Sequence, residues 1–136
     1  MPKTPRLSAP SLDALLAEQA RQTERLRLLA ARIAHLQPRA PGALALALVR
    51  CQGCGGCPHP QWRRAVWRRD RTGRRYLARR RIEASQVRRY LHLAPGFTPA
   101  LGEAVEEALA LCAERHRLND LIRQLRLRQA ASREGR

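Results

Sequence analysis

Three cysteines and a histidine fall within nine residues, in the run Cys51-Gln-Gly-Cys54-Gly-Gly-Cys57-Pro-His59. Thiolates and a neutral imidazole are the ligands that zinc prefers, and four of them complete a tetrahedral site without an open position. The glycines between the cysteines allow so short a loop to surround one ion without clashes of Cβ atoms. The run therefore predicts a structural Zn2+ site formed by Cys51, Cys54, Cys57 and His59.

The sequence leaves the fourth ligand of this site open. His59 follows Cys57 by only two residues, and Pro58 stiffens the link between them. Cys112 and His116 are the alternatives, because they lie four residues apart on one face of the last predicted helix and that face could reach the loop. If neither is a ligand, we expect Cys112 to be a small buried residue and His116 to lie at the surface.

A different cofactor would use the same cysteine spacing. Cys51, Cys54 and Cys57 imitate the first three ligands of a ferredoxin motif, and Cys112 would then be the fourth thiolate around an iron–sulfur cluster. A metal-free or redox-active thiol loop is the third alternative. Zn2+ is favoured, because closely spaced cysteines in a reducing compartment are more often metal ligands than disulfide partners.

The segment after the Cys/His run is rich in arginine. Between Arg63 and Arg81 there are ten arginines and a single acid, Asp70. Like charges on adjacent strands destabilise a sheet unless an anion relieves the repulsion, and guanidinium groups bind phosphates in a bidentate manner. Exposed tryptophans can stack on bases, although tryptophans of a small sheet are more often core residues. The predicted nucleic-acid-binding residues are Arg63, Arg64, Arg68, Arg69, Arg71, Arg74, Arg75, Arg79, Arg80, Arg81, Trp62 and Trp67.

The composition of the whole chain also favours a polyanionic partner. Its 136 residues include 27 Lys and Arg against 11 Asp and Glu, which gives a formal net charge of +16. Such a charge repels itself in the compact state and favours binding to nucleic acid. We expect DNA in preference to RNA. A GC-rich genome, whose codons favour arginine, is the alternative explanation for the excess of this residue.

The sequence shows no sign of a membrane protein or of a catalytic site. The N-terminus contains no apolar leader and no run approaches the length needed to span a bilayer, so we expect a cytoplasmic protein without a membrane partner. The few carboxylates fall mainly on predicted helix faces and are not gathered with bases and nucleophiles as catalysis requires. We therefore do not expect an enzyme.

Two long helices are predicted near the two ends of the chain. Residues 11–37 form the first, in which Ser11 can cap the opening turn and leucines recur in a coiled-coil-like pattern. Residues 98–131 form the second, with Thr98 as its cap and apolar side chains again spaced by three and four residues.

Three strands are predicted between these helices. Alternating leucine and alanine over residues 43–49 favours a strand, and residues 62–69 and 74–82 form two more. Asp70 and Gly73 stand at the first and last positions of the connection between the second and third strands, which suits a type I turn with a bulge. We therefore predict a three-stranded antiparallel sheet.

The faces of the second and third strands are only partly predictable. Alternation places Arg75, Arg79 and Arg81 on one face of the third strand, which would suit the binding of phosphates. On the second strand, Trp62 and Trp67 point to opposite faces, and each face mixes arginine with apolar residues. The sequence therefore does not predict which face of the sheet packs on the core.

The predicted fold class follows from these elements. We expect an α+β protein in which a small three-stranded antiparallel sheet with a zinc knuckle is flanked by long N- and C-terminal helices. Residues 43–93 form the central module of Cys/His loop, basic sheet and a short helix that begins at residue 83. Residues 1–10, with three prolines, are expected to be a flexible tail, and residues 132–136 to fray.

One family resemblance can be stated for residues 42–82. The order of Cys51, Cys57, His59 and the aromatic Trp62 resembles that of small uncharacterised prokaryotic proteins of mobile elements, in which a Cys/His knuckle precedes a basic, aromatic hairpin. The Cys-x2-Cys-x2-Cys spacing is tighter here than in that group, which bears on the fourth ligand. The resemblance implies an accessory DNA-binding role in recombination or transposition.

These observations lead to one preferred function and two alternatives. We predict a non-enzymatic, zinc-stabilised DNA-binding accessory factor, whose terminal helices pair with each other or with a partner, so that a homodimer is expected. An RNA-binding subunit of a larger ribonucleoprotein complex fits the same charge. A helical adaptor for protein interaction is the remaining alternative, with the metal module as its scaffold.

Overall fold

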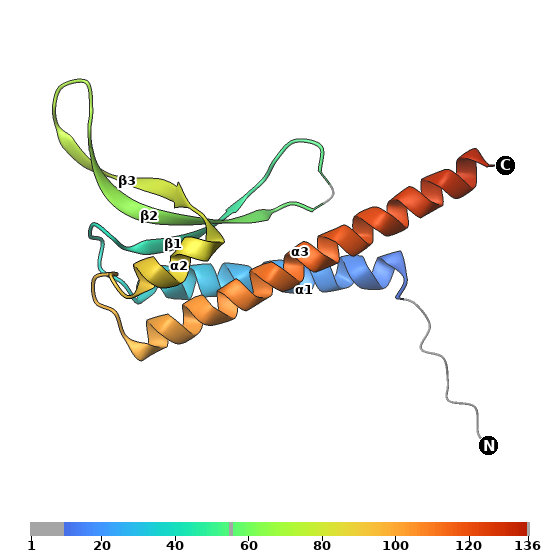
Figure 1. The fold of residues 1–136 in the computed structure, drawn as a ribbon, viewed down its shortest axis with the longest axis horizontal. Coiled ribbons are helices and arrows are strands. Elements are labelled where there is room, and N and C mark those ends of the chain that lie inside the picture. The colour runs from blue at the N-terminus through green and yellow to red at the C-terminus, as the bar shows by residue number, and fades with distance from the viewer. Residues whose placement is uncertain (1–9, 55, 136) are drawn as a thin grey trace, which may run out of the picture.

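The computed structural model describes residues 10–54 and 56–135, so the predicted tail lies outside the described residues except for Pro10. Three helices and an open three-stranded antiparallel sheet form the fold, which confirms the predicted α+β class (Figure 1). The elements are α1 (Leu12–His35), β1 (Leu44–Val49), β2 (His59–Arg69), β3 (Arg75–Ile82), α2 (Ala84–Leu91) and α3 (Pro99–Glu134).

Side-chain caps begin the two long helices. The Ser11 hydroxyl accepts a hydrogen bond from the backbone N–H of Ala14 at 3.1 Å. The Thr98 hydroxyl accepts one from Leu101 at 3.2 Å, and Pro99 occupies the first turn, where its missing N–H costs nothing. Both predicted caps therefore satisfy backbone donors that a helix start leaves free.

A segment with prolines explains where α1 ends, whereas no proline follows α3. α1 ends at His35, just before a segment with prolines at positions 38 and 41 that cannot continue a helix. α3 has no such breaker and continues to Glu134. Residues 132–134 are therefore helical, although the sequence analysis ends this helix at residue 131.

The connection between β2 and β3 is a tight turn. The Gly73 N–H donates to the Asp70 carbonyl oxygen at 3.1 Å, and Gly73 has φ of +83°, a conformation that favours glycine. The Asp70 carboxylate accepts hydrogen bonds from the N–H groups of Thr72 and Arg74 at 2.9 and 3.0 Å. This is the type I turn with a glycine bulge that the sequence predicts.

The core lies between one face of the sheet, the inner face, and all three helices. Strand pairing in the order β1-β2-β3 places Leu46 opposite Trp62 and Trp62 opposite Ile82, so all three point to the inner face. They pack with buried residues of the helices, which include Leu26, Ile33, Val87, Leu101 and Val105. Trp62 is 4% exposed, which answers the question of faces that the sequence left open.

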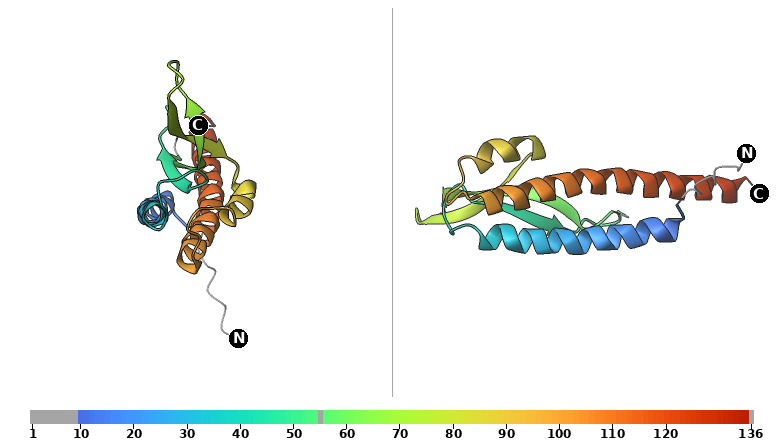
Figure 2. Two further views of the ribbon diagram at one scale, coloured as in Figure 1. Left: turned by 90° about the vertical axis from the view of Figure 1, so that its left-hand side faces the viewer. Right: turned by 90° about the horizontal axis from the view of Figure 1, so that it is seen from below.

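α1 and α3 run antiparallel beneath the sheet (Figure 2). Leu26 and Leu29 of α1 are buried in the main core, and Leu15 packs with Leu118 and Ile122 of α3 in a second, smaller cluster. The predicted leucine pattern of α1 is thus used inside the chain, against α3 and the sheet. No helix within the described residues is long and apolar enough to cross a membrane.

The outer face of the sheet is opposite the helices and carries five arginines that have no carboxylate partner among the described residues. By the same strand pairing it is formed by alternate residues of the three strands. On β2 and β3 these are Arg63, Ala65, Trp67 and Arg69, and Arg75, Leu77, Arg79 and Arg81. The end of the β2–β3 hairpin extends past the helices, as both views show (Figures 1 and 2).

Candidate metal centre and basic sheet face

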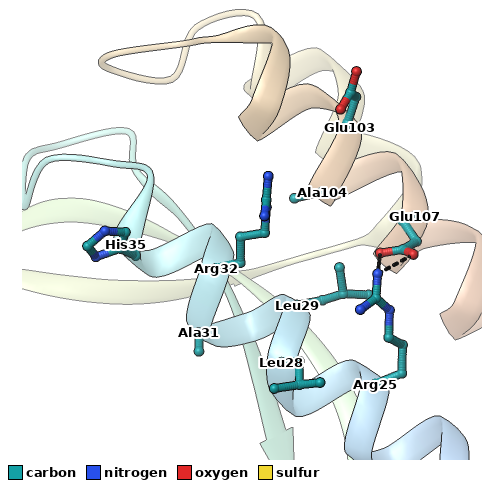
Figure 3. A pocket seen from close by; sticks show the side chains of 9 residues that line it. All are labelled: Arg25, Leu28, Leu29, Ala31, Arg32, His35, Glu103, Ala104 and Glu107. Atoms are coloured by element: carbon teal, nitrogen blue, oxygen red, sulfur yellow. Dashed lines mark hydrogen bonds and ion pairs between the residues drawn. The ribbon is translucent and has the colours of Figure 1, made fainter.

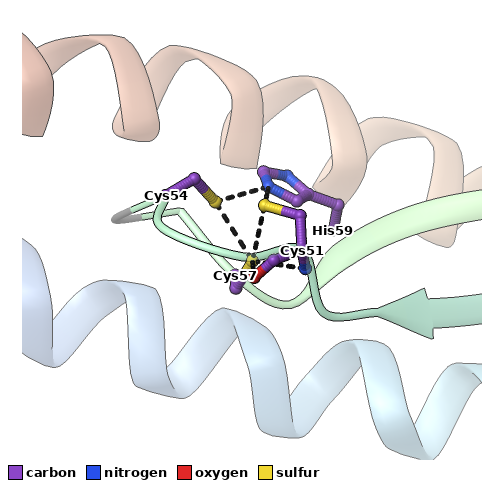
Figure 4. Close-up of side chains that lie close together, drawn as sticks. All are labelled: Cys51, Cys54, Cys57 and His59. Carbon is purple, nitrogen blue, oxygen red and sulfur yellow. Dashed lines mark hydrogen bonds between the residues drawn. The ribbon is translucent and has the colours of Figure 1, made fainter.

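The predicted metal ligands lie together in one cluster (Figure 4). Their four ligand atoms, the Sγ atoms of Cys51, Cys54 and Cys57 and the Nε2 atom of His59, all lie within 4.8 Å of one another. The Cys57 Sγ is 3.2 Å from that of Cys51 and 3.0 Å from that of Cys54. The His59 Nε2 is 2.8 Å from the Cys54 Sγ and 3.4 Å from the Cys51 Sγ. Such a group could bind a metal ion.

The strands hold the two ends of this loop together. Cys51 follows β1 closely, and β2 begins at His59, three residues before its predicted start, because His59 pairs with Val49. The Cys57 sulfur accepts a hydrogen bond from the Cys51 N–H at 3.1 Å. Gly53 has φ of +78°, which only glycine adopts without strain. The sheet therefore sets the separation of the ligands before an ion binds.

Two thiols of the cluster, those of Cys51 and Cys54, differ in pKa. Hydrogen bonds from Cys51 and Cys57 lower the pKa of the Cys54 thiol to about 6. The hydrogen bond with Cys54 is the main cause that raises the pKa of Cys51 to about 12. A metal ligand must be a thiolate, so Cys54 is the first to take that form, and an incoming cation would displace protons from the others.

The two alternative ligands lie outside the cluster. Cys112 is partly buried against the main core, and burial raises the pKa of its thiol to about 11. The side chain of His116 is 83% exposed, with its Nε2 3.8 Å from a carboxylate oxygen of Asp120. Among the described residues, the cluster of ligand groups includes neither Cys112 nor His116. The geometry therefore favours His59 as the fourth ligand, and the iron–sulfur alternative loses its fourth thiolate.

The arginines of the hairpin face one another across the two strands. Residues directly opposite in an antiparallel pair have Cβ atoms about 5 Å apart, and like charges there are destabilising. Three such pairs occur between β2 and β3: Arg63 with Arg81, Arg64 with Arg80, and Arg69 with Arg75. Two of these pairs lie on the outer face and one on the inner face.

Internal carboxylates do not neutralise this charge. The only acid of the hairpin, Asp70, is turned toward the backbone of its own turn, and hydrogen bonds, the strongest from the Thr72 hydroxyl, hold the pKa of its carboxyl below the usual range. The ion pairs between the described residues all lie on the helices. None of the ten hairpin arginines has a carboxylate partner among residues 10–54 and 56–135.

The aromatic residues of the hairpin separate into two kinds. Trp67 is 50% exposed on the outer face, where the Arg75 guanidinium lies 4.5 Å from its ring centroid. Trp62 belongs to the core, which corrects the prediction that its ring is available to nucleic acid. Arg64 also points inward, with its guanidinium 4.4 Å from the Tyr90 ring, so its contacts are with α2. Trp67 is therefore the predicted tryptophan that stays accessible.

Comparisons with family models, curated proteins and solved structures gave no match. The resemblance to mobile-element proteins thus stays a prediction. What can be concluded about this chain comes from its own residues and their geometry.

Arg115 is a residue of the site that the sequence analysis does not identify. Its side chain is 1% exposed and connects the Cys/His loop to α1. The guanidinium donates to the carbonyl oxygens of Gly56 and Pro58 at 3.4 and 3.1 Å, and to the Gln19 carbonyl and the Thr23 hydroxyl at 2.7 Å each. A single buried cation thus ties the loop to two helices.

Asn119 supports the same contact one turn further along α3. Its side-chain amide donates to the Gly56 carbonyl at 3.4 Å and accepts from the Gln19 side chain at 2.9 Å. A Cβ atom at Gly56 would lie 2.7 Å from the Asn119 amide nitrogen, so the loop approaches the helix closely enough to require glycine. In the sequence, Arg115 and Asn119 differ from surface residues only by their four-residue spacing on the buried side of α3.

Proposed function

We propose that this protein is a zinc-stabilised DNA-binding protein that contacts the phosphates of duplex DNA with the outer face of its sheet. The observation that carries the proposal is the two arginine pairs of the outer face, Arg63 with Arg81 and Arg69 with Arg75, which are directly opposed across β2 and β3 and have no carboxylate partners among the described residues. This arrangement opposes sheet formation unless an external anion relieves it. A polyanion of regular charge spacing is the partner that such a surface fits best.

Zinc is the metal that the ligand cluster fits best. Three thiolates and one imidazole form one of its standard structural sites, and four protein ligands leave no position for a substrate. With three thiolates the bound Zn2+ site carries a net charge of −1, and the buried Arg115 offsets that charge. Each ligand set of this kind contributes on the order of 10 kcal/mol to folding, which is as large as the stability of a small domain.

Duplex DNA is preferred over other polyanions because of the shape of the hairpin. A two-stranded ribbon fits the major groove, which is about 12 Å wide. The end of the β2–β3 hairpin is such a ribbon, extends past the helices and exposes Trp67 at 50% and Tyr76 at 46% (Figure 1). An accessory role in recombination or transposition is the most specific form of this proposal and is supported by the sequence resemblance alone.

The test is a titration of the protein with duplex DNA and with structured RNA at several salt concentrations. If ~6 phosphates are engaged, log affinity falls with log salt at a slope of roughly −5 on duplex DNA. The triple variant Arg75→Gln, Arg79→Gln and Arg81→Gln should weaken binding and reduce that slope by about 3, because each lost phosphate contact reduces it by about 1.

A control variant distinguishes an effect of the total surface charge from an effect of the arginines on the outer face. Arg21→Gln, Arg27→Gln and Arg133→Gln remove the same charge from exposed positions on α1 and α3. They should leave the salt slope close to that of the unchanged protein. Equal losses for the two triple variants, or no binding to either nucleic acid in dilute buffer, would refute the proposal. Tighter binding to RNA than to DNA would replace it with the ribonucleoprotein alternative.

A further inference from the structure

One face of α3 is exposed along most of the helix and has the spacing of a helix–helix interface. Its members are separated alternately by four and three residues, the repeat that keeps side chains on one face toward a partner helix. We call this face the α3 stripe. It consists of Glu103, Glu107, Ala110, Glu114, Arg117, Leu121, Gln124 and Arg128, all of them exposed. Leu121 is 50% exposed, which is unusual for a leucine at the centre of such a repeat.

The charges of α3 are segregated along its length. Residues 99–114 contain four glutamates and no arginine or lysine, whereas residues 115–134 contain six arginines and two acids. A helix with an acidic first half and a basic second half is complementary to a copy of itself in the antiparallel direction. The stripe has the same property in detail, because each residue has a suitable partner on the reversed helix.

We propose that two copies of this chain associate through antiparallel α3 helices, with the symmetry axis between residues 115 and 116. The stripe then pairs with itself in reverse order. In this register the two residue numbers of every facing pair add up to the same total. Glu114 faces Arg117 at the centre, Ala110 faces Leu121, Glu107 faces Gln124 and Glu103 faces Arg128 of the second copy. Every pair occurs twice, as a two-fold interface requires.

The ion pairs already present in the chain agree with this register. Glu107, which would face the uncharged Gln124, is bound to Arg25 of its own α1, with Arg25 Nη2 2.6 Å from its Oε1. Glu103, which would face Arg128, has no ion-pair partner in the part of the chain that the structure describes. Glu103, which has no ion-pair partner among the described residues of its own copy, is therefore the glutamate that faces Arg128 of the second copy.

The end of α3 also lacks support within the described chain. Leu125 packs in the small cluster with Leu15 at the start of α1, and the helix then continues to Glu134 past that point (Figures 1 and 2). Leu127 in this last segment is 64% exposed. A short helical segment without packing partners is only marginally stable in water. In the antiparallel pair it lies along the first half of the other α3.

In the antiparallel pair, the last segment of α3 lies in a groove of the second copy. Between α1 and the first half of α3 lies a groove of about 860 Å³, with Leu28 on one wall and Ala104 on the other (Figure 3). Leu28 is 62% exposed. Glu103 and Glu107 line the α3 wall of the groove, so a basic helix end from the second copy meets acidic side chains there. The groove and the α3 stripe form one continuous surface on the side of α3 away from the sheet.

The proposed pairing keeps the two basic sheets apart. The sheet packs over residues 101–112 of α3, so in the pair the two sheets are offset by about 18 residues of helix, or roughly 27 Å. Two charges separated by more than about 10 Å are largely screened at physiological salt. Self-repulsion between the arginine faces therefore does not oppose the association. This inference does not depend on nucleic-acid binding, and its test uses the free protein.

The test exchanges charges at the centre of the interface and measures mass by sedimentation equilibrium of the zinc-loaded protein. The unchanged chain should be a dimer at micromolar concentration. Glu114→Arg alone and Arg117→Glu alone each place two like-charge pairs at the axis and should weaken the dimer by roughly tenfold or more. An equimolar mixture of these two variants should restore a heterodimer, because both facing pairs at the axis then again join a guanidinium with a carboxylate. Effects within one helix cannot produce that recovery.

A matched pair of leucine variants completes the experiment. Leu121→Asp should abolish the dimer, whereas Leu93→Asp, which changes a leucine that is 64% exposed in the loop after α2 and lies outside the proposed interface, should leave it intact. Circular dichroism of each variant reports whether the helices are retained. A monomer at all accessible concentrations of the unchanged chain, no recovery in the mixture, or equal effects of the two leucine variants would overturn the proposal.

Discussion

The two ends of the sheet differ in how their charged groups are balanced. At the loop end, residues 51–59 bring three thiols and an imidazole together, and the buried cation beside them, Arg115, donates to four oxygens of the same protein. At the hairpin end, arginines lie opposite one another across β2 and β3 and have no carboxylate partner among the described residues. A metal ion would complete the first end, whereas no described residue balances the charge of the second.

This contrast separates stability from recognition. Contacts at the loop end join the strands to α1 and α3, so changes there should alter the free energy of unfolding. Side chains at the hairpin end contact solvent and one another, so changes there should alter binding and leave folding nearly unchanged.

Removal of the metal should have the largest effect. A structural site of four ligands contributes on the order of 10 kcal/mol, so chelation or Cys57→Ala should leave the chain largely unfolded. Thermal unfolding followed by circular dichroism, with and without a zinc chelator, measures the change. Elemental analysis should give one zinc per chain before chelation.

The control is the fourth cysteine of the chain. Cys112→Ala removes a thiol that packs against the core outside the cluster, so metal content should not change. If the chelated protein unfolded at the same temperature as the untreated protein, the loop end would not need an ion and the contrast between the two ends would fail.

Loss of Arg115 should have the next largest effect. Arg115→Met leaves the Pro58 carbonyl oxygen without its buried donor and the Gly56 carbonyl oxygen with the Asn119 amide alone, and such a loss costs about 3 kcal/mol. The affinity for zinc should also fall by roughly 10-fold to 100-fold, as is typical when groups behind the ligands are removed. Competition with a chromophoric chelator measures that affinity.

Arg133→Met on the same helix is the matched control. Arg133 is exposed near the end of α3, so its replacement should change neither stability nor zinc affinity. An equal loss of zinc affinity in the two variants would show that Arg115 acts only through the total charge.

Trp67 provides the smallest and most selective change. Trp67→Ala should weaken binding to duplex DNA by about 1 to 3 kcal/mol if the ring inserts between base pairs and stacks on them, with little change in the unfolding temperature, because the ring is half exposed. Fluorescence anisotropy with a labelled duplex measures the affinity.

Trp62→Ala is the opposite case on the same strand. Trp62 is buried in the core, and truncation of a buried tryptophan costs about 3 to 5 kcal/mol of stability. If Trp67→Ala destabilised the fold as strongly as Trp62→Ala, the hairpin end would be part of the core and the division proposed above would be incorrect.

The elements of this fold could be predicted because their signals are local. Ser11 and Thr98 mark helix starts, Asp70 and Gly73 mark the turn, and all four act within a few residues of their own position. The candidate metal ligands belong to the same class, since three fall in the loop between the paired strands β1 and β2 and the fourth, His59, begins β2. Their association did not depend on how distant segments meet.

What could not be predicted depends on contacts between distant segments. Trp62 and Trp67 lie on opposite faces of β2, and only the packing of the helices decides which of them is buried. Arg115 has the composition of a surface residue, and its burial follows from the meeting of α1, α3 and the loop. The leucines of α1 indicated a partner helix without indicating that α3 of the same chain would be that partner.

β3 forms one edge of the open sheet, and four of its eight residues are arginine. A free edge strand ordinarily invites a strand from another molecule to extend the sheet, which is a common first step toward fibres. Here an approaching copy would bring a second row of guanidinium groups against the first. The basic residues of β3 therefore also oppose edge-to-edge pairing between copies of the chain.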